Sequence, residues 1–183
     1  MELFDICDEE GKPTGQVVER EKAHALGICH RTAHIWVADR SDGQVRVLLQ
    51  KRAADKDSFP GCYDTSSSGH IQAGDEPLES ACRELKEELG INAEPKELCF
   101  IGTFSIQYES VFHVNPFRDN ETAFVYLYER KVKEEELSLQ TEEVESVKWF
   151  EMEEILTARK HKDPAFCVPS GSLEMLRDYL NSH

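Results

Sequence analysis

The chain has 183 residues, of which 39% are hydrophobic and 31% charged, and its formal net charge is −15. This length suffices for one ordinary domain with its own core. The negative charge argues against non-specific binding to nucleic acid, which needs a basic surface to displace counterions. An acidic protein that acts on a polyanion must recruit cations, so metal ligands are the first feature to look for.

The strands expected in the first half of the chain lie at 3–7, 16–19, 33–38 and 45–51. The first two form a hairpin around a turn at 8–13, and the other two are rich in β-branched and aromatic residues. Residues 52–61 are polar and loop-like. Residues 63–71 are small and hydroxyl-rich, which is typical of an edge strand that lines a site.

The second half predicts a helix at 77–89, strands at 97–105, 123–131 and 146–150, and helices at 152–159 and 172–181. Residues 107–122 form a connection of unusual length, as binding loops or lids often do. Strands that alternate with a few helices indicate an α/β fold with a mixed sheet flanked by helices. No repeat or linker divides the chain, so we expect a single domain over 1–183.

The six cysteines are scattered and form no C-x-x-C pair, which fits neither a disulfide framework nor a zinc cage. The chain opens with no basic-then-apolar leader, and no apolar run approaches the ~18 residues of a membrane span. We therefore predict a reduced, cytoplasmic protein with no membrane partner and no nucleic-acid polymer as partner.

The segment Gly69–Ile91, with the sequence GHIQAGDEPLESACRELKEELGI, carries its own helix signals. Pro77 suits the first helical turn, and Asp75 or Glu76 before it can cap free N–H groups. Gly90 is placed to end the helix in a left-handed turn. A bounded helix over 77–89 follows from these residues.

At about 100° per residue, one stripe of this helix is apolar and must face the core: Leu78, Ala81, Cys82, Leu85 and Leu89. Glu84 and Glu88 flank one edge of the stripe, and Glu87 lies further round the same side. Like charges at this spacing repel one another. Bound Mg²⁺ would turn the repulsion into coordination, because it takes carboxylate oxygens together with substrate phosphate oxygens.

The alternative is a solvated acidic face. The acidic runs at 134–136, 142–143 and 153–154 lack flanking glycines and a bounded amphipathic helix, and we assign them to the surface. Arg83 stands four residues before Glu87, where it can steady the carboxylates rather than touch substrate. Too many positions of the segment are fixed at once for a merely solvated face.

The segment resembles the Nudix box, G-x5-E-x7-R-E-U-x-E-E-x-G-U, in which U is a bulky aliphatic residue. The matching residues are Gly69, Arg83, Glu84, Leu85, Glu87, Glu88, Gly90 and Ile91. The one departure is Asp75, which stands where the box has Glu, so a role for Asp75 does not carry over.

The resemblance implies a Nudix-type α/β/α sandwich with a mixed sheet, and hydrolysis of a nucleoside diphosphate derivative or a related organic diphosphate. It implies that Glu84, Glu87 and Glu88 bind Mg²⁺ or Mn²⁺. The implied catalytic residues are Glu87, Glu88 and Arg83, with Glu121 as an acid that completes the metal site or serves as base. For Glu121, a solvated loop acid is the alternative.

The segments 30–37, 47–52 and 67–70, with Lys56, resemble the branch of the family that contains the type I isopentenyl-diphosphate isomerases. The likeness covers roughly 1–155, and 156–183 are expected to form a C-terminal helical extension. An isomerase is thus the rival hypothesis. It needs an acidic Cys before the Gly-His pair, where this chain has Ser68, and a hydroxyl is a far weaker acid than a thiol.

Several roles stay open at this point. The paired metal-binding histidines of the isomerases are loosely echoed by His24 and His30, and a lone histidine such as His70 is more often structural. Tyr63, Phe59 and Phe112 are candidates either for stacking a base or for core packing. A non-catalytic module that senses a nucleotide is a third hypothesis, and a homodimer is compatible with the sequence.

Overall fold

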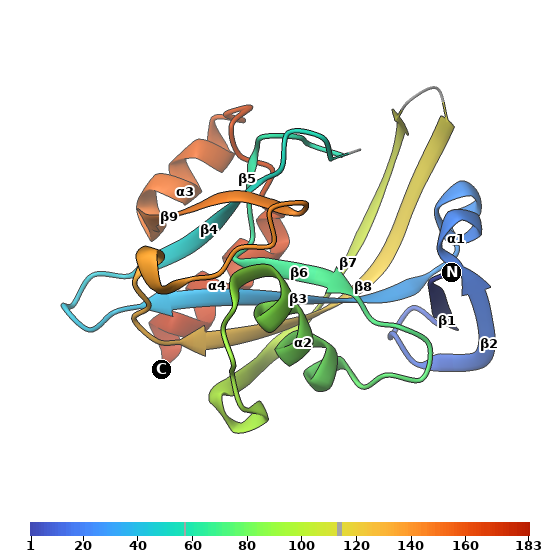
Figure 1. The fold of residues 1–183 in the computed structure, drawn as a ribbon, viewed down its shortest axis with the longest axis horizontal. Coiled ribbons are helices and arrows are strands. Elements are labelled where there is room, and N and C mark those ends of the chain that lie inside the picture. The colour runs from blue at the N-terminus through green and yellow to red at the C-terminus, as the bar shows by residue number, and fades with distance from the viewer. Residues whose placement is uncertain (57, 113–114) are drawn as a thin grey trace.

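The computed structural model describes residues 1–56, 58–112 and 115–183. Its centre is a mixed seven-stranded sheet with the order β5-β4-β3-β8-β7, in which β6 also pairs with β3 and β9 with β4 (Figure 1). The strands are β3 (His30–Asp39), β4 (Arg46–Arg52), β5 (Tyr63–Asp64), β6 (Ser67–His70), β7 (Leu98–Phe112), β8 (Asn115–Glu129) and β9 (Val144–Glu151). The central strands β3 and β8 run parallel, whereas the other pairs are antiparallel.

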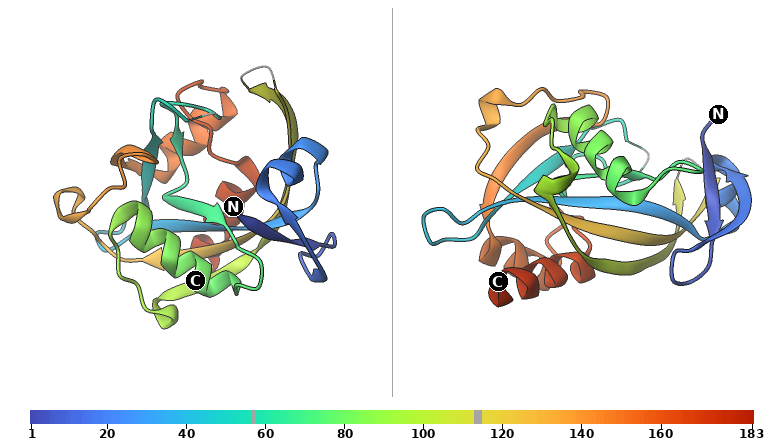
Figure 2. Two further views of the ribbon diagram at one scale, coloured as in Figure 1. Left: turned by 45° about the vertical axis from the view of Figure 1, so that its right-hand side comes forward. Right: turned by 90° about the horizontal axis from the view of Figure 1, so that it is seen from below.

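Helices cover both faces of this sheet, as the view from below in Figure 2 shows. On one face, α2 (Pro77–Leu89) buries Ala81, Leu85 and Leu89 against the sheet. On the other face lie α3 (Met152–Lys160) and α4 (Ser170–Ser182), whose apolar residues share a second core cluster with Trp36 of β3. The predicted α/β/α architecture is confirmed.

A small N-terminal unit caps one end of the sheet. It consists of a two-stranded hairpin, β1 (Leu3–Cys7) and β2 (Pro13–Glu19), followed by α1 (Arg20–Leu26), a helix that we did not predict from the sequence. Asp5 ties this unit down, because its Oδ2 accepts hydrogen bonds from Arg31 Nη2 at 2.8 Å and from the Gly74 amide at 2.9 Å. The cap is therefore fixed both to β3 and to the loop that leads into α2.

The prediction of a long loop over 107–122 is wrong. Most of that segment belongs to a single hairpin in which β7 and β8 stay paired far beyond the expected ends, with Gln107 opposite Asn120 and Tyr108 opposite Asp119. On this part of β7 the exposed and half-buried residues alternate, but many of them are polar. A strand with polar residues on both faces gives little hydrophobic periodicity, so it resembles a loop in the sequence.

Helix α2 has the bounds expected from the sequence. Pro77 stands in its first turn, and Gly90 ends it with φ at 73°, a left-handed conformation that favours glycine. The expected side-chain cap is absent, because the capping residue Glu76 makes no side-chain hydrogen bond to the helix. Across the described part of the chain, no helix combines the length and apolarity needed to cross a membrane.

Candidate active site

The loop–helix segment faces a cleft of about 720 Å³. All three box glutamates, Glu84, Glu87 and Glu88, line it together with Arg83 and Glu121. The opposite parts of the lining come from β4, from the segment between β4 and β5, and from the β7–β8 hairpin. The structure thus brings the five residues expected to bind metal or take part in catalysis into one cavity: Arg83, Glu84, Glu87, Glu88 and Glu121.

Glu88 is the most firmly held of the three glutamates. Only 5% of its surface is exposed, and its Oε2 accepts hydrogen bonds from Ser67 Oγ at 2.6 Å, the Ser68 amide at 3.1 Å and Gln50 Nε2 at 3.3 Å. Burial raises the pKa of the Glu88 carboxyl to about 8, although the bonds from Ser67 and Ser68 lower it. Since three donors occupy Oε2, Oε1 is the oxygen left for a further partner.

Arg83 braces the other two glutamates. Its Nη1 lies 2.7 Å from Glu84 Oε1 and 3.2 Å from Glu87 Oε2, and its Nη2 donates to the His70 carbonyl at 3.1 Å. Burial raises the pKa of the Glu84 carboxyl to about 7, and the Arg83 guanidinium opposes that rise. Glu87 is more open, with half of its side chain exposed. These contacts agree with the expectation that Arg83 steadies carboxylates.

The first glycine of the segment is needed for a steric reason. A Cβ on Gly69 would overlap the Glu84 carboxylate, which lies directly against the glycine backbone. Any side chain at position 69 would therefore push Glu84 away. The sequence pattern alone marks Gly69 as a match but does not reveal this contact.

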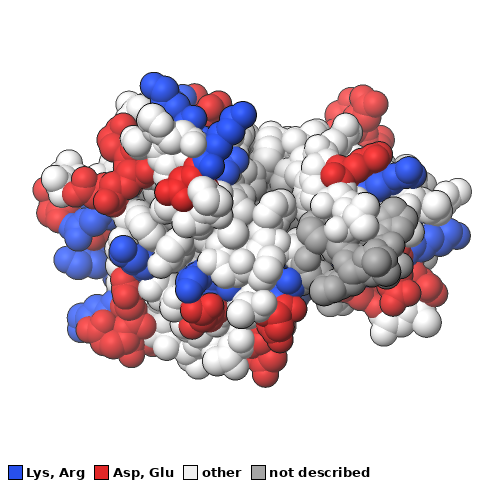
Figure 3. All heavy atoms as spheres, turned by 90° about the horizontal axis from the view of Figure 1, so that it is seen from above, with Lys and Arg blue, Asp and Glu red and all other residues white. Residues whose placement is uncertain are grey.

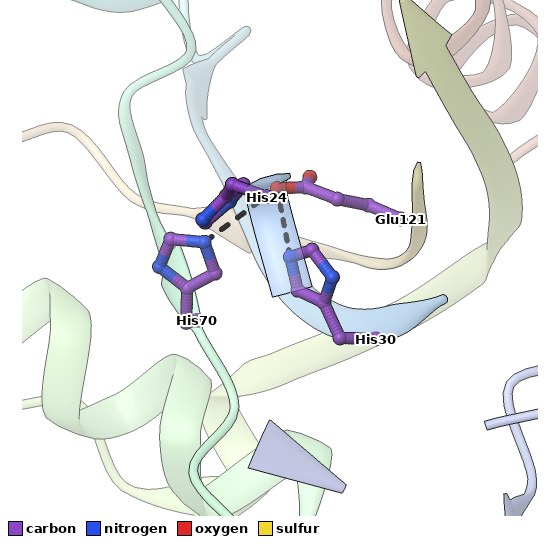
Figure 4. Close-up of side chains that lie close together, drawn as sticks. All are labelled: His24, His30, His70 and Glu121. Carbon is purple, nitrogen blue, oxygen red and sulfur yellow. Dashed lines mark ion pairs between the residues drawn. The ribbon is translucent and has the colours of Figure 1, made fainter. Parts of the chain in front are cut away.

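A second group of ligand-type side chains includes three residues that line the same cleft, His24, His70 and Glu121, and the fully buried His30. His24, His30, His70 and Glu121 each offer one ligand atom, and these four atoms all lie within 4.8 Å of one another (Figure 4). They come from α1, β3, β6 and β8. Glu121 Oε1 is 3.6 Å from His30 Nε2 and 3.7 Å from His70 Nε2.

The histidine nitrogens in this group are oriented for ligation. His24 Nδ1 and His30 Nδ1 each contact a backbone carbonyl, at 3.0 and 2.9 Å. A carbonyl only accepts, so Nδ1 carries the hydrogen and Nε2 keeps its lone pair. His30 Nε2 and His70 Nε2 are buried without a hydrogen-bond partner among the described residues. Buried polar atoms in this condition indicate that an ion or a water is their partner.

The charge states within this cluster favour cation binding. Burial lowers the pKa of His24 to about 4 and that of His70 to about 3, so both rings are neutral at pH 7. Burial by itself raises the pKa of Glu121, but the nearby imidazoles of His30 and His70 hold it below its ordinary range. Asp119, 3.8 Å from His24 Nε2, has a pKa raised to about 9 by burial and by Glu121.

The aromatic rings of β1 and β8 support the histidine cluster. Phe4 stacks on His30 and His70 at centroid distances of 4.9 and 4.5 Å, and Phe117 stacks on His24 at 4.6 Å. Such packing fixes the imidazole orientations. Because the four ligands come from separate elements, the sequence suggested His24 with His30 only through the resemblance and did not join them to His70 and Glu121.

The three aromatic residues that were candidates for stacking a base or packing the core have different surroundings. Tyr63 packs against Phe150 and Phe166 at centroid distances of 4.9 and 5.6 Å and belongs to the core. Phe59 lines the cleft and is 46% exposed. The side chain of Phe112 lies outside the described residues.

Comparison with protein families gives one decisive match, a NUDIX domain over residues 29–169. The chain belongs to the Nudix family. The match includes the box and three of the four clustered ligands, whereas His24 lies before it. Membership makes the chain an enzyme of the pyrophosphohydrolase class and leaves its substrate open.

Individual Nudix relatives agree with this assignment. The chain is 39% identical over 154 residues to an uncharacterized Nudix hydrolase of Clostridium acetobutylicum, covering 84% of this chain and 72% of the relative. It is 41% identical over 167 residues to Nudix hydrolase 3 of Arabidopsis thaliana, covering 90% of this chain but only 21% of that protein. A crystal structure of the Deinococcus radiodurans protein DR0079 has a similar fold, with a TM-score of 0.70 at 20% identity, covering 96% of this chain and 98% of that one.

Proposed function

We propose that this chain is a Mg²⁺-dependent Nudix hydrolase that cleaves the diphosphate linkage of a nucleoside diphosphate derivative or a related organic diphosphate. The observation that carries the proposal is the cleft, where Glu84, Glu87 and Glu88 lie together on one side. Arg20, Arg52 and Lys56 also line the cavity. A cleft lined by both acidic and basic side chains suits a polyanionic substrate that binds together with metal cations, although the chain has a net charge of −15.

Acidic and basic side chains are mixed on the face of the molecule seen from above. From above, Figure 3 shows acidic and basic side chains interspersed, without one large patch of a single sign. The cleft itself is also lined by residues of both signs, so a diphosphate does not meet acidic side chains alone. We infer that metal ions bound by the box carboxylates contact the substrate phosphates. The basic side chains of the cleft then balance the phosphate charge that the metal ions leave uncompensated.

The box carboxylates fit a divalent cation on chemical grounds. Glu84 and Glu88 are buried acids whose pKa values are raised to about 7 and 8 by burial. A cation would favour their ionised forms, and oxygen ligands suit Mg²⁺. When bound, Mg²⁺ or Mn²⁺ supplies neutralisation of the diphosphate charge and an acidified water. In this proposal Arg83 holds Glu84 and Glu87 in place, and Glu88 is oriented by Ser67 and Ser68.

The histidine cluster fits a second kind of cation. Three imidazoles and a carboxylate suit a divalent transition metal better than Mg²⁺, which prefers oxygen ligands alone. We assign this cation to His24, His30, His70 and Glu121. On this assignment Glu121 is a metal ligand, and Thr32 Oγ1, which donates to Glu121 Oε2 at 3.1 Å, orients it.

Isomerisation of isopentenyl diphosphate is the second candidate function, because His24 and His30, which the resemblance relates to the paired metal-binding histidines of the isomerases, lie in the histidine cluster. The required acidic thiol is still missing at Ser68. Another thiol, Cys167, also lines the cleft, but burial raises its pKa, and its Sγ donates to the Tyr63 carbonyl at 3.4 Å. It is therefore a poor replacement acid, and hydrolysis remains our proposal.

The other parts of the proposal concern cellular context. A substrate of low molecular weight fits a cavity of this size. All six cysteines are free thiols, which supports the predicted cytoplasmic location.

A single domain over 1–183, including the C-terminal helices, stays a prediction, as does the homodimer.

A diphosphate panel tests the proposal. The wild-type protein is incubated with nucleotide sugars, dinucleotides, nucleoside diphosphates and isopentenyl diphosphate, with Mg²⁺, Mn²⁺ or EDTA. Phosphorus NMR detects cleavage, and proton NMR detects movement of a double bond. We expect cation-dependent cleavage of at least one compound and no isomerisation. Isomerisation without phosphate release would establish the second candidate, and tight binding without any turnover would establish the sensor hypothesis.

A further inference from the structure

Two thiols meet where the N-terminal cap joins the central sheet. Cys7 is the last residue of β1, and Cys29 stands directly before β3. Their Sγ atoms lie 3.3 Å apart, although the two residues are 22 positions apart in the sequence. The fold of the cap therefore brings these thiols together.

The backbone holds the two cysteines in the relation that a disulfide requires. The Cys7 amide donates to the Cys29 carbonyl at 3.1 Å, so the two residues belong to neighbouring, hydrogen-bonded segments. Disulfides join residues whose Cα atoms are roughly 4.4–6.8 Å apart, a range that directly hydrogen-bonded neighbours satisfy. Because an S–S bond measures about 2.05 Å, the sulfur atoms need to approach by only about 1.2 Å.

The two thiols differ in their access to a reagent. Cys7 is only 5% exposed, whereas Cys29 is half-buried. Cys29 Sγ also contacts the Asp8 carbonyl at 3.6 Å and Thr122 Oγ1 at 3.8 Å. A thiol is a weak hydrogen-bond donor, so these long contacts do not hold Cys29 away from Cys7. An accessible thiol beside a buried one is the arrangement of an attacking and a resolving cysteine.

The thiol pair lies at the junction between the cap and the histidine cluster. Cys29 directly precedes His30, and Phe4, on the same strand as Cys7, stacks on the His30 ring at 4.9 Å. The segment between the two cysteines contains α1, which contributes His24. In Figure 1 β1 lies at the end of the sheet where β3 begins. A covalent bond here would close the cap into a loop anchored on β3.

We propose that Cys7 and Cys29 form a reversible disulfide, a redox modification site that locks the N-terminal cap onto β3. The oxidant is hydrogen peroxide. The Cys29 sulfur attacks one peroxide oxygen, the O–O bond breaks, and Cys29 becomes a sulfenic acid as one water leaves. The Cys7 sulfur then attacks the Cys29 sulfur, so that the S–S bond forms, the S–O bond breaks and a second water leaves. One peroxide is reduced to two waters, which carry away the hydrogens of the two oxidised thiols.

The reversible bond is compatible with the free thiols of the structure and with the predicted cytoplasmic location. Cytosolic disulfides, where they occur, are usually transient and serve catalysis or redox sensing. The direction of the effect follows from chain entropy. Linking residues that are 22 positions apart removes many conformations from the opened cap. The cap should therefore open less often in the oxidised protein.

Peptide mapping tests whether the bond forms. The wild-type protein is treated with hydrogen peroxide, free thiols are alkylated, and the digest is analysed by mass spectrometry with and without dithiothreitol. We expect a linked peptide that joins Cys7 to Cys29 and disappears on reduction. C29S should lose this peptide, and the matched control C99S should keep it, because Cys99 is an exposed thiol on β7. Wild-type protein in which peroxide leaves both thiols alkylated, or oxidises Cys29 without linking it to Cys7, would overturn the proposal.

Amide hydrogen exchange tests whether the bond locks the cap. Exchange is compared between the oxidised and the reduced wild-type protein, followed peptide by peptide. We expect the amides of β1, β2 and α1 to exchange more slowly by about tenfold or more after oxidation, while those of α4 stay unchanged. Equal exchange of the cap in the two forms would overturn the locking role. Both measurements need neither substrate nor metal, so their outcome is independent of the proposed hydrolysis.

Discussion

Replacing Gly69 by alanine tests whether Mg²⁺-dependent hydrolysis depends on the position of the Glu84 carboxylate. The added Cβ would overlap all three atoms of the Glu84 carboxyl group, whereas carbon contacts are comfortable only from ~3.5 Å. The carboxylate must therefore move by about 1 Å or more. Gly69 has no left-handed φ, so the backbone itself accepts alanine and the strain falls on Glu84.

The magnitude follows from what that displacement does to cation binding. A misplacement of about 1 Å at a reacting centre can cost 10²-fold in rate, and loss of an outer-sphere partner typically costs 10–100-fold in metal affinity. We expect G69A to raise the Mg²⁺ concentration for half-maximal hydrolysis by 10–100-fold on this basis. The assay is a Mg²⁺ titration of initial rates, with circular dichroism to confirm the fold.

Gly171 provides the matched control for this substitution. It lies in α4, and a Cβ there would meet the Phe104 ring at an ordinary 3.4 Å. G171A should leave the Mg²⁺ requirement unchanged. An unchanged Mg²⁺ requirement in G69A as well would refute the idea that Glu84 must stay where Gly69 admits it.

Three further predictions concern the supports of the site. The buried Trp36 indole N–H donates to Ser172 Oγ at 2.9 Å, so Ser172→Ala leaves it without an acceptor. The free energy of unfolding in urea should fall by about 1–3 kcal/mol, and an unchanged urea midpoint would show that this bond does not hold α4. Asp5→Ala removes one partner of the buried pair with Arg31 and should cost about 3–5 kcal/mol in the same measurement, and a loss under about 1 kcal/mol would contradict it. Glu121→Gln should reduce the transition metal retained after dialysis, measured by mass spectrometry, while leaving the Mg²⁺ titration of the box largely unchanged; full retention would remove Glu121 from the ligand set.

The sequence was most informative where the signals were local. Pro77 and Gly90 bound a helix whose apolar stripe faces the core, and the structure has α2 at those bounds. The acidic edge of that stripe does line a cleft. These features depend on residues a few positions apart, so periodicity and capping rules are enough to find them.

Features assembled from distant segments were beyond the sequence. The histidine cluster joins four elements, and His24 comes from a helix that was not predicted at all. A lone histidine in a sequence carries no sign of its neighbours. The contact between Gly69 and Glu84 likewise arises only when β6 and α2 pack together.

The β7–β8 hairpin shows a different limit. The outer half of β7 alternates exposed and half-buried residues without a continuous apolar face, so the period-2 signal is weak. The two strands nevertheless pair in register from Ser105 opposite Thr122 out to Phe112 opposite Asn115. Pairing of this kind is stabilised across the ladder rather than by one face of a strand, and a single segment does not display it.

The central claim, that the box carboxylates support Mg²⁺-dependent hydrolysis, is tested most directly by Glu87→Gln. Its control is Glu79→Gln, a neutralised glutamate on the same helix that does not line the cleft. The measurement is the Mg²⁺-dependent rate of diphosphate cleavage, followed by phosphorus NMR. We predict that E87Q loses at least about a hundredfold in rate, beyond the typical effect of an outer-sphere partner, with its fold intact and E79Q unaffected. A wild-type rate in E87Q would contradict this claim.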